Sequence, residues 1–205
     1  MVAGARHLTR EQVIAGAGLV GRPVFTANVK DARTAILKLP AVRDARVRLT
    51  FPDAAQIDVT ERDAVGRWLA GGIEWYVDAD GVLFGSADPQ GAPEVRVTDD
   101  RVATRTCAGA AGGRCLDPAL VAAALRLTRI APGELRADAV RPEVRVDQTQ
   151  GLVVRSGAGW EIRFGSADDL ERKLSNAKQV LRDNPVRRLD YVDVRSPDRI
   201  VFSPQ

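Results

Sequence analysis

The sequence predicts an α+β fold, in which a β-α-α-β-β unit over residues 1–62 precedes a mainly antiparallel β domain with flanking helices over residues 63–205. Near the N-terminus, two segments with helix caps are followed by two runs of alternating apolar and polar residues. After residue 63, short apolar runs recur between turns rich in glycine and aspartate.

The first forty residues predict one short strand and two helices. The run VAGAR is the strand candidate. Thr9 is expected to cap the first helix with Gln12 as its capping-box partner, and Gly16 and Gly18 to end it. Asn28 caps the second helix, which Pro40 stops. The residues expected on the buried faces are Val13, Ile14 and Ala17 in the first helix and Val29, Ala32, Ile36 and Leu37 in the second.

The charged stretch from Ala41 to Leu69 predicts a half-buried antiparallel hairpin. Its apolar residues fall on one parity, and arginine, aspartate and threonine fall on the other. The segment FPDAA supplies the turn between the two strands. The charges are therefore interpreted mostly as a solvated face. The residues predicted to face the core are Ala45, Val47, Leu49, Phe51, Ile57 and Val59.

The remainder of the chain is richer in strands. The predicted strands are AVGRWL, IEWYVD, GVLFG, EVRVD, GLVVRS, WEIRFG, RLDYVDVR and DRIVFS. A helix is predicted over Pro118–Ile130. A second is predicted over Ala167–Asn184, capped by Ser166 with Asp169, with Leu170, Leu174, Ala177 and Leu181 as its apolar stripe and Asn184-Pro185 as its end. The polar stretch Ser86–Arg114 gives no clear assignment.

Composition excludes several classes of protein. The chain has 205 residues, is 45% hydrophobic, and contains no apolar run long enough to span a bilayer. Its N-terminus has no signal-peptide pattern. The net charge of +3 comes from 30 basic and 27 acidic side chains that are interspersed, and only 5% of residues are aromatic. The sequence therefore argues against nucleic-acid binding, despite a pI of 9.2.

The two cysteines lie in one glycine-rich loop, TCAGAAGGRC. Cys107 and Cys115 are eight residues apart, so they can close a disulfide loop, which would imply an oxidising compartment. The alternative is two free thiols on a surface loop.

Motif analysis assigns no catalytic, cofactor or metal residue. GAGLVG matches a dinucleotide-binding pattern, but a helix precedes it and a loop follows, which inverts the required context. DADG lacks the later acidic ligands of a calcium loop and is interpreted as a turn. His7 is the only histidine and lies near the chain end, where it is a poor candidate for a catalytic base. An enzyme built on two distant carboxylates stays open as a minor alternative.

Four segments in order resemble the FtsQ/DivIB family of bacterial division proteins. AGARHLTREQVIAGAGLVGRPVF is similar to the opening of that family's POTRA domain. LPAVRDARVRLTFPDAAQIDVTERDAVGRW resembles the family's most recognisable segment. WYVDADGVLF and LDYVDVRSPDRIVF are similar to its later motifs. The chain departs from the family pattern at Ala41, Leu49 and Ala64.

The resemblance implies a POTRA domain over residues 1–62, an FtsQ/DivIB-type β domain over residues 63–205, and a membrane helix outside this chain. It also implies a non-catalytic scaffold without cofactors, located at the division septum with this part outside the membrane. The implied partners are FtsB/DivIC-type and FtsL-type coiled-coil proteins and the septal peptidoglycan synthase complex.

The resemblance places partner binding at the C-terminal strand. The expected contact residues are Tyr191, Asp193, Arg195, Ser196, Ile200 and Phe202. Tyr191, Asp193 and Arg195 share one face by parity, and Arg195 is the best single candidate because a guanidinium can pair bidentately with a partner carboxylate. Arg33 and Arg46 are the candidates for a docking face on the POTRA domain. The rival interpretations are a covered edge strand with a rim salt bridge, and a POTRA module that acts on unfolded chains in secretion or outer-membrane assembly.

Overall fold

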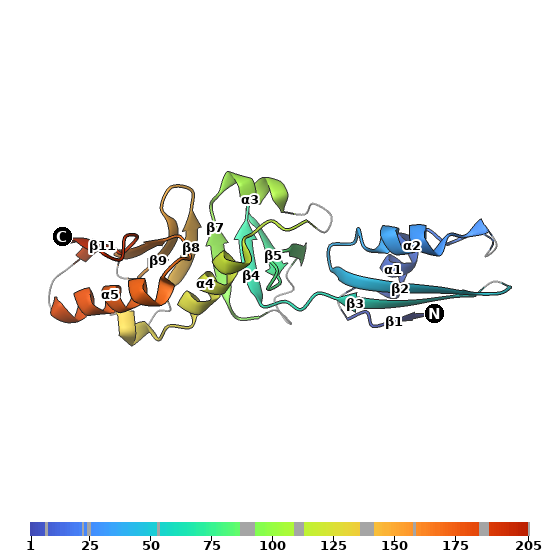
Figure 1. The fold of residues 1–205 in the computed structure, drawn as a ribbon, viewed down its shortest axis with the longest axis horizontal. Helices are drawn as coiled ribbons and strands as arrows, with labels where there is room; N and C mark the ends of the chain where they lie inside the picture. The colour runs from blue at the N-terminus through green and yellow to red at the C-terminus, as the bar shows by residue number, and fades with distance from the viewer. Residues whose placement is uncertain are drawn as a thin grey trace.

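The computed structural model describes residues 1–6, 8–21, 23, 26–52, 54–86, 93–108, 113–135, 142–157, 159–184 and 189–204. It shows an elongated molecule, with the N-terminal unit at one end of the long axis and the C-terminal strands at the other (Figure 1). His7, Pro185 and parts of the stretch Ser86–Arg114 lie outside the described residues.

The N-terminal unit is a three-stranded sheet with two helices. Its elements are β1 (Val2–Ala3), α1 (Arg10–Ala17), α2 (Val29–Ile36), β2 (Val42–Thr50) and β3 (Ala54–Glu61). The sheet order is β1-β3-β2, with β1 parallel and β2 antiparallel to β3. The helices and sheet enclose a small apolar core made of Val13, Ala17, Ala32, Ile36, Val42, Ala45, Val47, Ile57 and Val59.

The predicted caps and hairpin of this unit are confirmed. Thr9 and Gln12 form a reciprocal capping box, and the Asn28 side chain accepts from the Lys30 amide. Gly18 ends α1 in the left-handed region, whereas Gly16, which was also predicted to end this helix, lies inside it. Two burial predictions are wrong. Phe51 is exposed because it lies in the turn beyond Thr50, the last residue of β2. Val29 is exposed at the first position of α2, and this helix ends at Ile36, before Pro40.

The second unit is built on one nine-stranded sheet. Its elements are β4 (Gly66–Ala70), β5 (Ile73–Val77), β6 (Leu83–Ser86), β7 (Arg96–Asp99), α3 (Val102–Cys107), α4 (Pro118–Thr128), the 3-10 turn η2 (Pro132–Leu135), β8 (Glu143–Asp147), β9 (Gly151–Arg155), β10 (Glu161–Gly165), α5 (Leu170–Asp183), β11 (Leu189–Asp193) and β12 (Val201–Pro204). The strand order is β12-β11-β10-β9-β8-β7-β4-β5-β6. The α+β class is thus confirmed, with a sheet that combines antiparallel pairs with parallel ones at β10–β11, β7–β8 and β4–β7.

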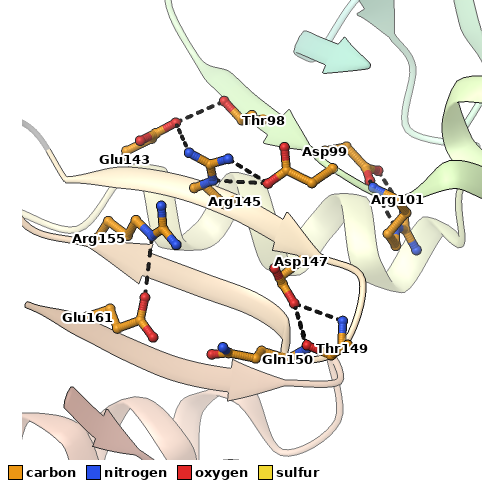
Figure 2. Close-up of polar contacts among 11 residues, drawn as sticks. Thr98, Asp99, Arg101, Glu143, Arg145, Asp147, Thr149, Gln150, Arg155 and Glu161 are labelled. Carbon is orange, nitrogen blue, oxygen red and sulfur yellow. Dashed lines mark hydrogen bonds and ion pairs between the residues drawn. The ribbon is translucent and has the colours of Figure 1, made fainter. Parts of the chain in front are cut away.

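The two faces of this sheet differ in character. Helices α4 and α5 pack on one face, against β7, β8, β10 and β11. The opposite face carries charged side chains that pair between neighbouring strands, as Arg145 does with Glu143 and Asp100 and as Arg155 does with Glu161 (Figure 2). Long side chains can cover apolar surface with their stems while their charged ends stay in water. Val153 accordingly lies buried between Arg145 and Arg163 on the charged face.

The helices of this unit begin and end differently from the prediction. Asp117 caps α4, which ends at Thr128 rather than Ile130. Helix α5 begins at Leu170, and the predicted cap by Ser166 with Asp169 is wrong. Asp169 adopts a left-handed conformation with φ of 52° and makes no side-chain cap bond. The oxygens of Ser166 instead accept hydrogen bonds from the buried Lys173 ammonium.

The stretch without a sequence assignment contains strand β7 and helix α3. Cys107, the last residue of α3, is joined to Cys115 by a disulfide, with 5.5 Å between the two Cα atoms. The Asp99 carboxylate at the end of β7 is buried, where it accepts from the Trp68 indole at 2.8 Å and pairs with Arg101.

Candidate partner-binding edge of the sheet

Strand β12 forms one edge of the nine-stranded sheet. Within the described residues it pairs with β11 alone, in antiparallel register, with Val192 opposite Phe202 and Asp193 opposite Val201. This edge lies at the end of the molecule farthest from the N-terminal unit (Figure 1). An edge strand offers backbone N–H and C=O groups to which a further strand can bind.

The direction of the backbone groups of β12 follows from its register. The Val194 amide donates to the Arg163 carbonyl on β10, and successive residues of a strand direct their backbone groups to alternate sides. Val192 therefore also directs its groups at β10, so its opposite residue Phe202 is not hydrogen-bonded to β11. Phe202 directs its N–H and C=O outward, towards the position of an added strand. Pro204 has the same parity but no N–H to offer.

The side chains along this edge are apolar and exposed. Ile200, Val201 and Phe202 are 38%, 43% and 36% exposed. Phe202 lies opposite the buried Val192 on the helix-covered side, whereas Val201 lies opposite Asp193 on the charged side. A strand added here would meet apolar side chains on both faces of the sheet.

Arg195 and Asp193 form a charged pair beside the edge. The guanidinium donates through Nε to both Asp193 oxygens at 3.0 Å and through Nη2 to one of them at 2.6 Å. Burial of the Asp193 carboxylate opposes its ionisation, yet the side-chain and backbone hydrogen bonds from Arg195 bring its pKa below the usual value. Among the described residues, these contacts occupy two of the five N–H groups of Arg195, so three are left for another acceptor.

Gly165 determines where the Arg195 stem lies. A Cβ atom at Gly165 would stand 2.9 Å from Arg195 Cγ, so the absence of a side chain lets the stem pack against the end of β10. Gly165 also has a φ of 72°, in the left-handed region that favours glycine. The arginine is thus held against the sheet rather than free in solvent.

A second arginine lies on the same face, one strand further in. The Arg163 guanidinium carbon stands 4.1 Å from the centre of the Tyr191 ring, and its Nε donates to Glu161 at 2.8 Å. A cation over an aromatic face is attracted by the ring quadrupole. Tyr191, Arg163 and the Asp193–Arg195 pair therefore form one continuous polar surface beside β12.

Helix α5 fixes the connection between β11 and β12. The Asn176 side-chain amide donates to the Pro197 carbonyl at 2.8 Å, and Arg172 pairs with Asp198. The Arg199 amide donates to the Ser196 carbonyl at 3.0 Å, which closes a tight turn. These contacts position the last strand, and all of them lie in the connection that precedes it.

The structure gathers the six C-terminal residues predicted from the sequence at one sheet edge. Tyr191 and Asp193 lie on β11, Arg195 and Ser196 in the connection, and Ile200 and Phe202 on or beside β12. The sequence analysis did not predict that Arg163, Gly165 and Asn176 lie beside this edge. The alternation in WEIRFG already places Arg163 on the polar face, whereas nothing in the sequence indicates that Gly165 or Asn176 lies near the C-terminus.

The two candidates in the N-terminal unit do not share one face. Arg33 on α2 donates through Nε to the Ala45 carbonyl at 2.8 Å and pairs with Asp44, so it covers part of the outer edge of β2. Arg46 is exposed on β2, opposite Asp58, and has the other parity from the buried Ala45. The two arginines thus stand on opposite sides of the three-stranded sheet.

The described residues contain no group of three or more histidine, cysteine, aspartate or glutamate side chains suited to hold a metal ion. Among the same residues, no helix combines the length and the apolar character that a membrane crossing requires. What the edge offers chemically is backbone pairing, apolar contact and a charged rim, all of which suit recognition of a polypeptide strand.

Comparisons with known proteins agree on one family. A model of the FtsQ-type POTRA domain matches residues 1–62, and a model of the C-terminal part of the cell division proteins FtsQ and DivIB matches residues 66–195. The second match ends before β12 begins. The chain is 29% identical over 196 residues to the cell division protein FtsQ of Chloroflexus aurantiacus, covering 95% of this chain and 68% of that protein. It is 32% identical over 201 residues to FtsQ of Streptomyces griseus, covering 95% and 90%.

Proposed function

Because the chain belongs to the FtsQ/DivIB family of cell division proteins, we propose that it is a non-catalytic scaffold of the division machinery that binds coiled-coil partners along β12. The partners are FtsB/DivIC-type and FtsL-type proteins, through which it links to the septal peptidoglycan synthase complex. The observation that supports this role is the edge position of β12, with outward backbone groups at Phe202 and exposed apolar side chains.

The binding mode is strand addition. A partner strand would hydrogen-bond to the N–H and C=O of Phe202, and Pro204 would end the run of available donors because it has no N–H. Arg195 would use its three remaining donors on a carboxylate of the partner while Asp193 holds its orientation. Ile200 and Val201 would add apolar burial.

The family and the disulfide support a proposal for the cellular location. We propose that a membrane helix outside this chain anchors it and that the two units lie outside the membrane, enriched at the septum. The Cys107–Cys115 disulfide supports this compartment, since disulfides persist in oxidising environments.

The test of strand addition is a proline at Phe202. Proline removes the outward N–H and places a ring in the path of an added strand, yet it breaks no bond to β11, since edge strands tolerate proline where the N–H faces solvent. We expect the Kd of a synthetic peptide covering the partner segment beyond its coiled coil to rise at least about tenfold, the equivalent of about 1.4 kcal/mol. Fluorescence anisotropy measures it.

Matched variants distinguish the contribution of the Arg195 charge from that of backbone pairing. Arg195→Glu is expected to weaken binding, whereas Arg199→Glu, which reverses another exposed arginine four residues away, is the control. Truncation after Ser196 should abolish binding. Circular dichroism verifies folding, and an unchanged Kd in folded Phe202→Pro and Arg195→Glu proteins would refute this mode of binding.

We also propose that the outer edge of β2 in the POTRA domain contributes to recruitment. Arg33 covers this edge at Ala45, and by alternation Val47 directs its backbone groups outward beyond it. Arg33→Glu should therefore reduce septal localisation of the full protein in a complementing cell, and Arg46→Glu tests the opposite face. Normal localisation of both variants would place recruitment elsewhere.

A further inference from the structure

We infer that Arg62 and Asp78 form a lock that holds the POTRA domain and the β domain in one fixed orientation. Arg62 directly follows the last residue of β3, and Asp78 directly follows the last residue of β5. Their side chains meet at 2.7 Å between Nη1 and Oδ2 and are only 13% and 7% exposed.

One guanidinium makes bonds to both units. Arg62 Nε donates to the Pro40 carbonyl at 3.0 Å, and its backbone amide donates to the Ala41 carbonyl at 2.8 Å. These bonds tie the arginine to the start of β2, while Nη1 reaches the carboxylate of the other unit. Because the guanidinium is planar and rigid, its two contacts specify direction as well as distance.

Asp78 belongs to a turn that cannot easily move. Its second oxygen, Oδ1, accepts from the amides of Asp80 and Val82 at 3.0 and 2.9 Å. Gly81 in this turn packs so closely on the Leu116 backbone that a Cβ atom would stand 2.1 Å from its carbonyl oxygen. The carboxylate is therefore fixed to the segment that leads into α4, so the lock acts on the body of the β domain.

An apolar cluster also spans the junction between the two units. It consists of Ala41, Tyr76 and Phe84, with Leu8 and Ala64 packed against it. Contacts of this kind resist separation of the two units, but they specify direction poorly because apolar surfaces can slide over one another. The buried ion pair has one favourable geometry, and removal of either partner leaves an uncompensated charge.

The connection between the two units is short. The Val65 amide donates to the Val77 carbonyl at 2.8 Å, so Val65 already belongs to the β domain. Asp63 and Ala64 alone separate it from Arg62. Domains joined by a small interface generally move relative to each other. Here the lock removes that freedom, and it keeps the β2 edge and the β12 edge at a constant separation.

The test measures a distance between the two units. Spin labels at Thr34 on α2 and Ser175 on α5, both exposed, are attached through a ketone-bearing amino acid so that the disulfide stays intact. Pulsed electron paramagnetic resonance of the whole chain should give one narrow distance distribution. We expect Arg62→Gln to widen this distribution at least twofold.

Two further variants make the result decisive. Arg43→Gln removes an exposed pair across the same junction, Arg43–Asp80 at 3.5 Å, and should leave the distribution narrow. Asp78→Asn keeps an oxygen for the turn amides but removes the charge, and should widen the distribution as Arg62→Gln does. If Arg62→Gln fails to fold, the width of the distance distribution in Asp78→Asn provides the test. A broad distribution in the unaltered chain, or an unchanged one in the folded lock variants, overturns the inference. No division partner is needed, so the result is independent of strand addition at β12.

Discussion

Among single residues, Lys173 is unusual because its ammonium group is buried. The residue is 2% exposed, and its Nζ atom donates to the carbonyl and hydroxyl oxygens of Ser166 at 3.1 and 3.3 Å. Burial disfavours the charged form and lowers the pKa of Lys173 below its usual 10.5, although Asp168 and Asp169 oppose this shift. Between the lowered pKa and 10.5, the unfolded chain binds more protons than the folded one. The contribution of Lys173 to the free energy of unfolding therefore rises as the pH increases from the lowered pKa to 10.5.

We expect Lys173→Met to remove that rise. The free energy of unfolding at pH 7 should change by less than about 1.5 kcal/mol, because methionine fills a similar volume without a buried charge. Urea unfolding from pH 7 to 10.5 measures the difference between the variant and the unaltered chain. Lys30→Met, at an exposed lysine of α2, is the control. Parallel pH profiles for the Lys173 variant and the unaltered chain would contradict the assignment.

At the scale of elements, α1 and α5 show two ways to begin a helix. Helix α1 has only eight residues, and its first turn is satisfied by the reciprocal bonds between Thr9 and Gln12, at 3.2 and 2.8 Å. Helix α5 has fourteen residues and begins without a side-chain cap. Its buried stripe of Leu174, Ala177, Val180 and Leu181 holds it on the sheet. A short helix depends on its cap more than a long, well-packed one does.

Thr9→Ala should lower the free energy of unfolding by about 1 kcal/mol, because it leaves the Gln12 amide without its acceptor. Thr34→Ala, at an exposed interior position of α2, should be neutral or slightly stabilising because alanine is the better helix former. Chemical denaturation followed by circular dichroism compares the two. Equal losses from both substitutions would argue against the cap as the cause.

At the scale of the whole molecule, two separate cores are joined by the lock. The three tryptophans, Trp68, Trp75 and Trp160, all lie in the β domain. Their fluorescence therefore reports the unfolding of that domain, whereas circular dichroism reports both. This division makes the coupling between the cores measurable.

Ile36→Ala tests that coupling. Ile36 is fully buried in the POTRA core, and its truncation should cost about 2–5 kcal/mol. If the two domains unfold as one unit, the tryptophan signal shifts to lower denaturant together with the circular dichroism. Val29→Ala, at an exposed position of the same helix, is the control. It should change the free energy of unfolding by no more than about 0.5 kcal/mol, whether this is followed by fluorescence or by circular dichroism. A POTRA transition that separates while the fluorescence midpoint stays constant would show that the domains unfold independently.

Most of the helices and strands could be predicted from the sequence alone, because their signals are local. The parity of Ala45, Val47, Ile57 and Val59 places each on the buried side of the hairpin. The caps at Thr9 and Asn28 depend on residues two or three positions apart. The order of motifs along the chain was also sufficient to indicate the family, and that resemblance placed the candidate site at the last strands, where Tyr191, Asp193 and Arg195 share a parity.

The pairing of distant segments could not be predicted in this way, because parallel neighbours leave no pattern in the intervening sequence. Strand β7 stands between β4 and β8, each parallel to it and far from it in the chain, and its four residues were too few to predict alone. The surroundings of Asp99 and Arg195 also depend on residues distant in the sequence. Asp99 is buried against Trp68, and the position of the Arg195 stem depends on Gly165. The alternation of the hairpin predicts Arg62 as one more charge on a solvated face, and only the approach of β5 makes it a buried partner of Asp78.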